Sequence, residues 1–119
     1  MHELSLASAI VATVERHAGG RPVVAVNVRA GALRQVVPDS LHFAFELVRS
    51  GTALDRAELV IDHVPVRVRC RPCGAEGVLA ELPLTCGDCR SGDLELLSGE
   101  ELLVAAIELE EESQRIGAT

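Results

Sequence analysis

Four cysteines in two matched pairs constrain this chain more than any other feature of its sequence. Two residues separate Cys70 from Cys73, two separate Cys86 from Cys89, and twelve lie between the pairs. A two-residue gap lets both sulfurs of a pair turn inward in one tight knuckle. Two such knuckles across a hairpin supply four thiolates in the tetrahedral geometry that suits Zn²⁺. The spacing therefore predicts a closed, structural zinc site.

The alternatives to zinc are a thioredoxin-like redox pair and a chance arrangement. A redox CxxC normally occurs singly near the start of a helix, so two matched pairs weigh against it. The stretch from Cys70 to Cys89 has few large apolar residues, too few to bury a core of its own. Metal binding of order 10 kcal/mol would supply the missing stability. Gly74 and Gly87 would let the backbone turn back toward sulfur.

Hydrophobic periodicity predicts two helices outside this stretch. The first ends at Gly19 and Gly20, and its apolar stripe consists of Leu4, Ala7, Val11, Val14 and Ala18. The second begins near Pro38 or Asp39 and ends with Gly51 as its cap. Its stripe consists of Leu41, Ala44, Phe45 and Val48.

Alternating apolar residues predict three strands. The first, 23–30, is apolar on both faces and is expected at the centre of a sheet. The second is 58–64, with Leu59 and Ile61 on one face. Residues 101–110 alternate as well, although a helix is the other interpretation; a strand that returns to the first sheet is favoured.

These elements predict an α+β fold: a small three-stranded sheet with two helices, plus an inserted zinc-ribbon domain. The expected domain boundaries are 1–68 with 98–112 for a discontinuous α/β domain, 69–97 for the zinc ribbon, and 113–119 for a flexible tail.

Charge and composition exclude several classes of function. Eleven basic and 18 acidic residues give a formal net charge of −7, which opposes binding to nucleic acid, and aromatic residues make up only 2% of the chain. No apolar run approaches the roughly 18 residues that span a bilayer, and no export signal opens the chain. We therefore expect a cytoplasmic protein without nucleic-acid or membrane partners. No nucleophile–base pair or phosphate-binding glycine loop is visible, so no enzymatic activity is predicted.

The chain opens with Met1, His2 and Glu3, a combination that can bind a metal. The α-amine of Met1, the backbone amide nitrogen of His2 and its imidazole can close fused chelate rings, and such nitrogen-rich coordination suits Ni²⁺ or Cu²⁺. Glu3 could contribute its amide nitrogen, its carboxylate, or a hydrogen bond to the imidazole. The bland alternative is a frayed end before a helix whose first turn favours an acidic residue.

Several segments together resemble the HypA/HybF family of hydrogenase nickel-incorporation proteins. In chain order they are 1–7, 36–46, 51–52, the two cysteine pairs and 94–102. The resemblance covers the chain up to about residue 110. It departs at Ala32 and Gly87, where family members often carry Glu and Pro, and neither departure removes a ligand.

The resemblance implies a nickel metallochaperone. Met1, His2 and Glu3 match the family's nickel-binding motif, with Ni(II) as transported cargo, and the four cysteines match its structural Zn(II) ligands. The implied partners are a HypB-like hydrogenase-maturation GTPase and the large subunit of a [NiFe] hydrogenase. Assembly into a homodimer is left open.

The rival hypothesis is a zinc-ribbon adaptor or nucleic-acid-binding module in which His2 is incidental. The three other histidines are expected to be surface or packing residues: His17, His42 and His63. A solvated acidic end is expected from Glu108, Glu110, Glu111 and Glu112.

Overall fold

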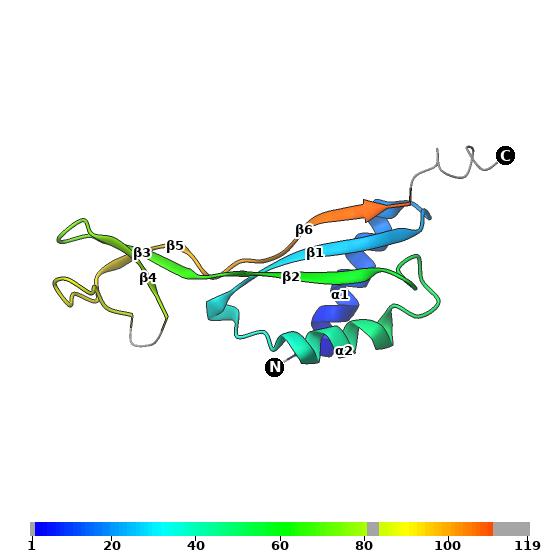
Figure 1. Ribbon diagram of the computed structural model, residues 1–119, viewed down its shortest axis with the longest axis horizontal. Helices are drawn as coiled ribbons and strands as arrows, with labels where there is room; N and C mark the ends of the chain where they lie inside the picture. The colour runs from blue at the N-terminus through cyan, green and yellow to red at the C-terminus, as the bar shows by residue number, and fades with distance from the viewer. Residues whose placement is uncertain (1, 81–83, 111–119) are drawn as a thin grey trace. The chain divides into compact units, whose positions relative to one another are not determined.

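The computed structural model describes residues 2–80 and 84–110. Their elements are α1 (Glu3–Ala18), β1 (Val23–Gly31), the 3₁₀ helix η1 (Ala32–Arg34), α2 (Pro38–Val48), β2 (Glu58–Val64), β3 (Val66–Cys70), β4 (Glu76–Leu79), β5 (Leu94–Ser98) and β6 (Leu102–Leu109) (Figure 1). The strands form two three-stranded sheets, in the orders β2-β1-β6 and β4-β3-β5. The predicted α+β class is confirmed.

The chain divides into two compact units, each built from separate segments. One comprises 1–28, 36–61 and 104–119, and the other 29–35 and 62–103. The domain boundaries expected from the sequence, with a ribbon at 69–97, stay a prediction. The predicted tail, 113–119, lies outside the described residues.

Helix α1 packs against α2 in the first unit, but its buried stripe differs from the predicted one. Leu4 is 57% exposed, whereas Glu3 is only 8% exposed and Ile10 is buried. At 3.6 residues per turn, Glu3 falls on the same face as Ala7 and Ile10, and Leu4 lies beyond the edge of that face. Gly19 ends the helix as predicted, in a left-handed conformation with φ 60°.

Helix α2 begins at Pro38, as predicted, but ends before Gly51. The cap is Arg49, which keeps a right-handed helical conformation and donates its N–H to the Phe45 carbonyl. The Thr52 hydroxyl and N–H both donate to the Arg49 carbonyl, at 2.6 and 3.1 Å, so a side chain closes the helix end. Gly51 lies two residues past the cap, and the prediction that it caps the helix is wrong.

Strand β1 is the central strand of its sheet, and β6 returns to that sheet; both predictions are confirmed. Val26 and Val28 are buried, but Val24 is 44% exposed. The regular alternation expected over 23–30 therefore breaks near the start of β1. The largest fully buried side chains of this unit are Phe45, Leu41, Leu54, Val14, Val26 and Val28.

Strand β3 is the centre of the second sheet, and Cys70 is its last residue. Val66, Val68 and Cys70 are buried, so one face of the strand is covered. On the other face, Arg69 contacts Glu76 of β4 at 3.3 Å and Glu95 of β5 at 3.1 Å. These side chains are nearly half exposed, so the ion pairs add little stability by themselves.

Two glycines allow backbone segments of the second unit to touch. A Cβ on Gly31 would lie directly against the carbonyl of Gly99, and a Cβ on Gly99 would lie 2.8 Å from the Cα of Val66. The Gly31 N–H donates to the Glu101 carbonyl at 2.6 Å, and the Gly99 N–H donates to the Glu101 carboxylate at 2.7 Å. The end of β1 is thereby bonded to the link between β5 and β6.

Candidate metal centre

The first cysteine knuckle begins where β3 ends. The Cys70 N–H donates to the Ala75 carbonyl at 2.8 Å, and the Gly74 N–H donates back to the Cys70 carbonyl at 2.7 Å. Gly74 has φ 78°, in the left-handed region that glycine adopts without strain. The predicted role of Gly74 is confirmed, because it allows the tight turn.

The second knuckle repeats these bonds with a different residue at the turn. The Cys86 N–H donates to the Ser91 carbonyl, and the Arg90 N–H donates to the Cys86 carbonyl, both at 2.9 Å. Arg90 has φ 64° and occupies the position equivalent to Gly74, four residues after the first cysteine. The left-handed position of the second knuckle is therefore Arg90, and Gly87 is not among the glycines with positive φ.

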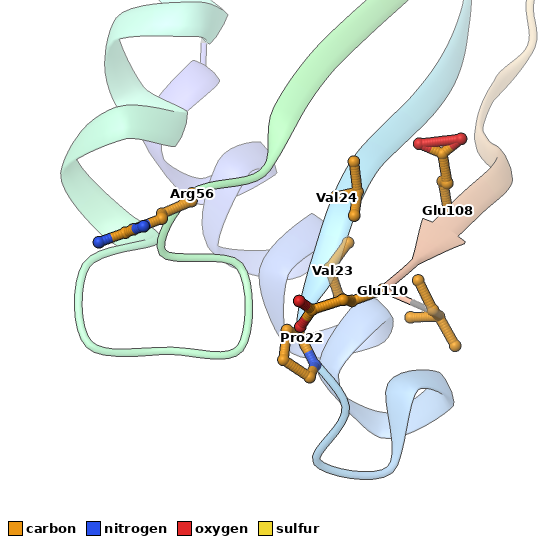
Figure 2. Close-up of a pocket in the computed structure, with 7 residues that line it drawn as sticks. Pro22, Val23, Val24, Arg56, Glu108 and Glu110 are labelled. Atoms are coloured by element: carbon orange, nitrogen blue, oxygen red, sulfur yellow. The ribbon is translucent and has the colours of Figure 1, made fainter. Parts of the chain in front are cut away.

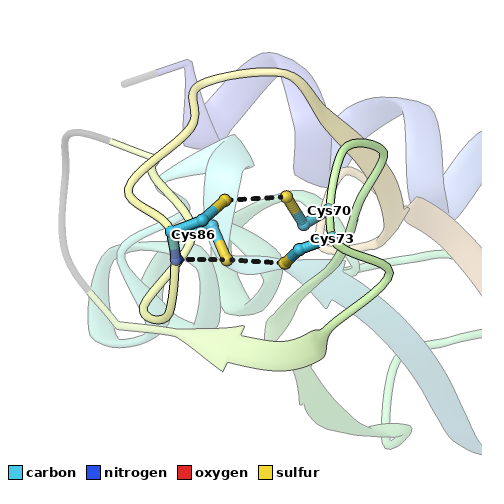
Figure 3. A group of neighbouring side chains, drawn as sticks. Cys70, Cys73 and Cys86 are labelled. Carbon is cyan, nitrogen blue, oxygen red and sulfur yellow. Dashed lines mark hydrogen bonds between the residues drawn. The ribbon is translucent and has the colours of Figure 1, made fainter.

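The knuckles bring all four sulfurs together, within 4.8 Å of one another. The Sγ atoms of Cys70 and Cys89 lie 3.4 Å apart, and those of Cys73 and Cys86 lie 3.7 Å apart (Figure 3). All four cysteines are free thiols. Zinc–sulfur bonds of about 2.3 Å in a tetrahedron separate the sulfurs by about 3.8 Å, so this donor set fits Zn²⁺.

The pKa values of Cys86 and Cys70 are shifted in opposite directions. The N–H groups of Cys89 and Asp88 donate to the Cys86 sulfur at 3.5 and 3.4 Å and lower the pKa of Cys86 to about 6. The Cys73 N–H lowers the pKa of Cys70, but burial and hydrogen bonds among the thiols outweigh it and raise that pKa to about 12. Near neutral pH, the lowered pKa of Cys86 favours its thiolate form.

His2 and Glu3 lie at the start of α1 in opposite environments. His2 is exposed, and its carbonyl accepts the Leu6 N–H at 2.9 Å. The buried Glu3 carboxylate accepts the N–H of Val37, the residue before α2, at 3.3 Å. Met1 lies outside the described residues.

The remaining histidines are on the surface, as predicted: His17, His42 and His63 are all exposed. Within 2–80 and 84–110, the cysteines form the only group of three or more histidine, cysteine or carboxylate side chains close enough to share an ion. Glu108 is exposed and Glu110 is half-buried, while Glu111 and Glu112 lie outside the described residues.

A hollow of about 560 Å³ lies at the end of the first sheet (Figure 2). Its lining is Pro22, Val23, Val24, Arg56, Glu108, Leu109 and Glu110. None of these is a candidate ligand from the sequence, and their mixed, open lining does not gather metal donors.

Two residues with a structural role here were not predicted from the sequence: Val37, which bonds to Glu3, and Arg90 of the second knuckle. Nothing in the sequence marks Val37, because its role is a backbone N–H that meets a residue 34 positions away. Arg90 could have been found by superimposing the two knuckles, since it follows Cys86 by the same interval as Gly74 follows Cys70.

Fold and site together define a class of protein: a small α+β protein whose ribbon gathers four thiols into a closed centre suited to a structural metal. The family model described as hydrogenase/urease nickel incorporation, metallochaperone, HypA matches residues 1–109. The chain belongs to the HypA family, whose members are metallochaperones and maturation factors and not enzymes. The resemblance seen in the sequence is confirmed.

Similar proteins match over most of their length. A hydrogenase maturation factor HypA from Desulfosudis oleivorans is 44% identical, over 93% of this chain and 100% of the relative. One from Streptomyces avermitilis is 42% identical, over 93% of this chain and 88% of the relative. The solution structure of the Ni metallochaperone HypA from Helicobacter pylori has a TM-score of 0.66 at 26% identity, covering 94% of this chain and 100% of that one.

Among the described residues, no helix is both long and apolar enough to cross a membrane.

Proposed function

We propose that this protein carries Ni²⁺ on its amino terminus and delivers it, together with a HypB-like GTPase, to the large subunit of a [NiFe] hydrogenase in the cytoplasm. Membership of a nickel-incorporation family supports the cargo. The observation that carries the assignment of the site is the exposure of His2 immediately before α1. An exposed ligand at a chain end can be released to an acceptor one bond at a time, which favours exchange over storage.

The nickel ligands in this proposal are the α-amine of Met1, the imidazole and backbone nitrogen of His2, and Glu3. Nitrogen donors in fused chelate rings suit Ni²⁺ better than Zn²⁺. The amine, the imidazole and the backbone nitrogen must each lose a proton to bind nickel, so acidification weakens the site.

For Glu3, three modes of participation were left open by the sequence. The residue is 8% exposed and its carboxylate accepts the Val37 N–H, an arrangement that supports a positioning role for the side chain. In that role Glu3 fixes the first turn of α1 against the start of α2 and holds His2 at the surface.

The zinc in this proposal is structural and is held by Cys70, Cys73, Cys86 and Cys89. Four sulfurs complete the tetrahedron and leave zinc no position for water or substrate. Their convergence within 4.8 Å supports the assignment. Zinc binding would hold together a unit whose β4 strand has no fully buried residue.

A nickel titration of untagged, zinc-loaded protein tests the nickel site. We expect one nickel equivalent to bind the unchanged chain, and His2→Ala to abolish that binding while zinc content stays the same. His17→Ala, which removes another exposed histidine, is the matched control and should bind nickel normally.

A second modification tests the α-amine. Acetylation of the Met1 amine removes it as a donor without creating a new one, so nickel affinity should fall at least about tenfold with the loss of a chelate ring. Unchanged nickel binding in both His2→Ala and the acetylated protein would refute the ligand assignment. Zinc binding with no nickel site at all would favour the adaptor hypothesis.

A further inference from the structure

Strand β6 is the edge of the first sheet, and its outer side pairs with no strand in 2–80 or 84–110 (Figure 1). An edge strand presents a row of backbone N–H and carbonyl groups to which another extended chain can bond. Proteins usually protect such an edge with Lys, Pro or an inward charge. From Leu102 to Ile107 this strand has none of these residues.

A groove of about 210 Å³ accompanies this edge. Thr13, Val14 and His17 of α1 form one wall, and residues 104–107 of β6 form the other. Val104 and Ile107 are half-buried, and Ala105 and Ala106 are exposed. A strand added beside β6 would therefore find apolar surface for the side chains it turns toward α1, as well as backbone partners.

The charged residues on either side of 102–107 indicate which kind of extended segment could pair with β6. Glu100 and Glu101 precede the uncharged run, and Glu108 and Glu110 follow it. One arginine lies at each end, since Arg34 donates to the Glu100 carbonyl at 2.7 Å and Arg21 to the Glu110 carbonyl at 3.0 Å, so carboxylates outnumber the arginines bonded there. Opposite charges placed across neighbouring strands stabilise the pairing, and like charges destabilise it. An incoming strand with basic residues at its ends would be favoured at both ends of β6.

The same charges disfavour a second copy of this chain at this edge. If 102–107 pairs antiparallel with itself, Glu101 lies opposite Glu108 in both halves of the dimer. A shift of two residues one way places Glu101 opposite Glu110, whereas the opposite shift places Glu101 opposite Ala106 and Glu108 opposite Gly99. Like charges therefore oppose a homodimer through β6 in two of these three registers.

We propose that the outer edge of β6 binds an extended segment of another protein, apolar at its centre and carrying Arg or Lys at both ends. The segment adds to the sheet as a further strand, with its apolar residues in the groove beside α1. This site contains none of the proposed metal ligands, so its test is independent of the nickel proposal.

The test uses two synthetic peptides with the same Val-Thr-Val-Thr-Val centre, one with Arg-Lys at each end and one with Glu-Glu. Amide hydrogen exchange of the zinc-loaded protein is measured with each. The basic peptide should slow exchange in 102–109, and the acidic peptide should bind at least about fivefold more weakly, since two oppositely charged ends are replaced by like charges.

Two variants locate the site. Glu108→Lys should weaken the basic peptide and strengthen the acidic one, whereas Asp39→Lys, an equal charge change at an exposed residue of α2, should leave the difference between the peptides nearly unchanged. Ala105→Lys places a charge within the apolar run and should weaken both peptides. Circular dichroism and zinc content verify that each variant is folded.

Three results would overturn the proposal: no protection in 102–109 with the basic peptide, equal affinity for the two peptides, or an equal response to the changes at Glu108 and Asp39. Protection of 102–109 in a dimer of the protein alone would assign the edge to a second copy and also reject the proposed occupant.

Discussion

Arg90 shows how a single residue can make a turn that glycine makes elsewhere in the same protein. Gly74 and Arg90 both have positive φ, at 78° and 64°, and both follow their first cysteine by four residues. A side chain in the left-handed region costs on the order of 1 kcal/mol relative to glycine. The second knuckle therefore holds a strained position that the first avoids.

Replacing this residue should relieve the strain. We expect Arg90→Gly to raise the free energy of unfolding of the zinc-loaded protein by about 0.5–1 kcal/mol, less than the full strain because glycine also gains freedom in the unfolded chain. Chemical denaturation followed by circular dichroism measures this difference. Gly87→Ala is the matched control, because a Cβ there meets no atom within 4 Å and should be tolerated. A loss of stability in Arg90→Gly would show that the arginine side chain contributes more than its backbone costs.

At the scale of elements, two hydrogen bonds to Glu101 fix the link between β5 and β6. The Glu101 carboxylate accepts the Gly99 N–H within that link, and the Glu101 carbonyl accepts the Gly31 N–H at the end of β1. The Gly99 N–H is the main cause of a lowered pKa for the Glu101 carboxyl, with the Glu101 backbone N–H and the Arg29 charge acting in the same direction and burial opposing them. A lowered pKa means that the unfolded chain binds the proton more tightly than the folded one.

The pH dependence follows from this direction. Ionised Glu101 contributes its full stability above the ordinary pKa of 4.5 and loses it as the pH falls through the lower value of the folded protein. We expect Glu101→Gln to reduce stability near pH 7 and to flatten its loss on acidification below pH 4.5. Urea midpoints at several pH values measure this. Glu100→Gln, at an exposed neighbour whose carbonyl and not its carboxylate accepts from Arg34, controls for net charge. Identical acid profiles for Glu101→Gln and the unchanged protein would contradict the expectation.

Elements were predictable where local pattern decides them. The end of α1 at Gly19 and the return of β6 to the first sheet follow from hydrophobic periodicity and from the glycine that stops the helix. The burial of Glu3 and the closure of α2 by Thr52 were not predictable, because each depends on a polar bond formed only in the folded chain. The convergence of the four cysteines could be predicted from their spacing, and their role as zinc ligands stays a prediction.

At the scale of the whole molecule, the proposed zinc site and the first sheet depend on different forces. Phe45, Leu41 and Leu54 give the first unit a buried apolar core, whereas β4 has no fully buried residue and the cysteine knuckles need a metal to neutralise their thiolates. The expected domain boundaries place the metal-dependent part at 69–97.

Removing zinc should therefore unfold one part of the chain before the other. With a strong chelator, we expect rapid amide hydrogen exchange across 69–97 while amides of α1, α2 and β1 stay protected. Exchange measured by mass spectrometry, with the metal-saturated protein as reference, distinguishes residues 69–97 from α1, α2 and β1. Simultaneous loss of protection in both regions would show that the parts fold as one cooperative unit.

X-ray absorption at the nickel and zinc edges of untagged protein loaded with both metals tests most directly whether this chain has two unlike metal sites. Thiolate ligation at 70–89 and nitrogen-rich ligation at the amino terminus predict four sulfur neighbours around zinc and only nitrogen and oxygen neighbours around nickel. Sulfur in the nickel shell, or a zinc shell short of four sulfurs, would contradict the separation of cargo from structural metal.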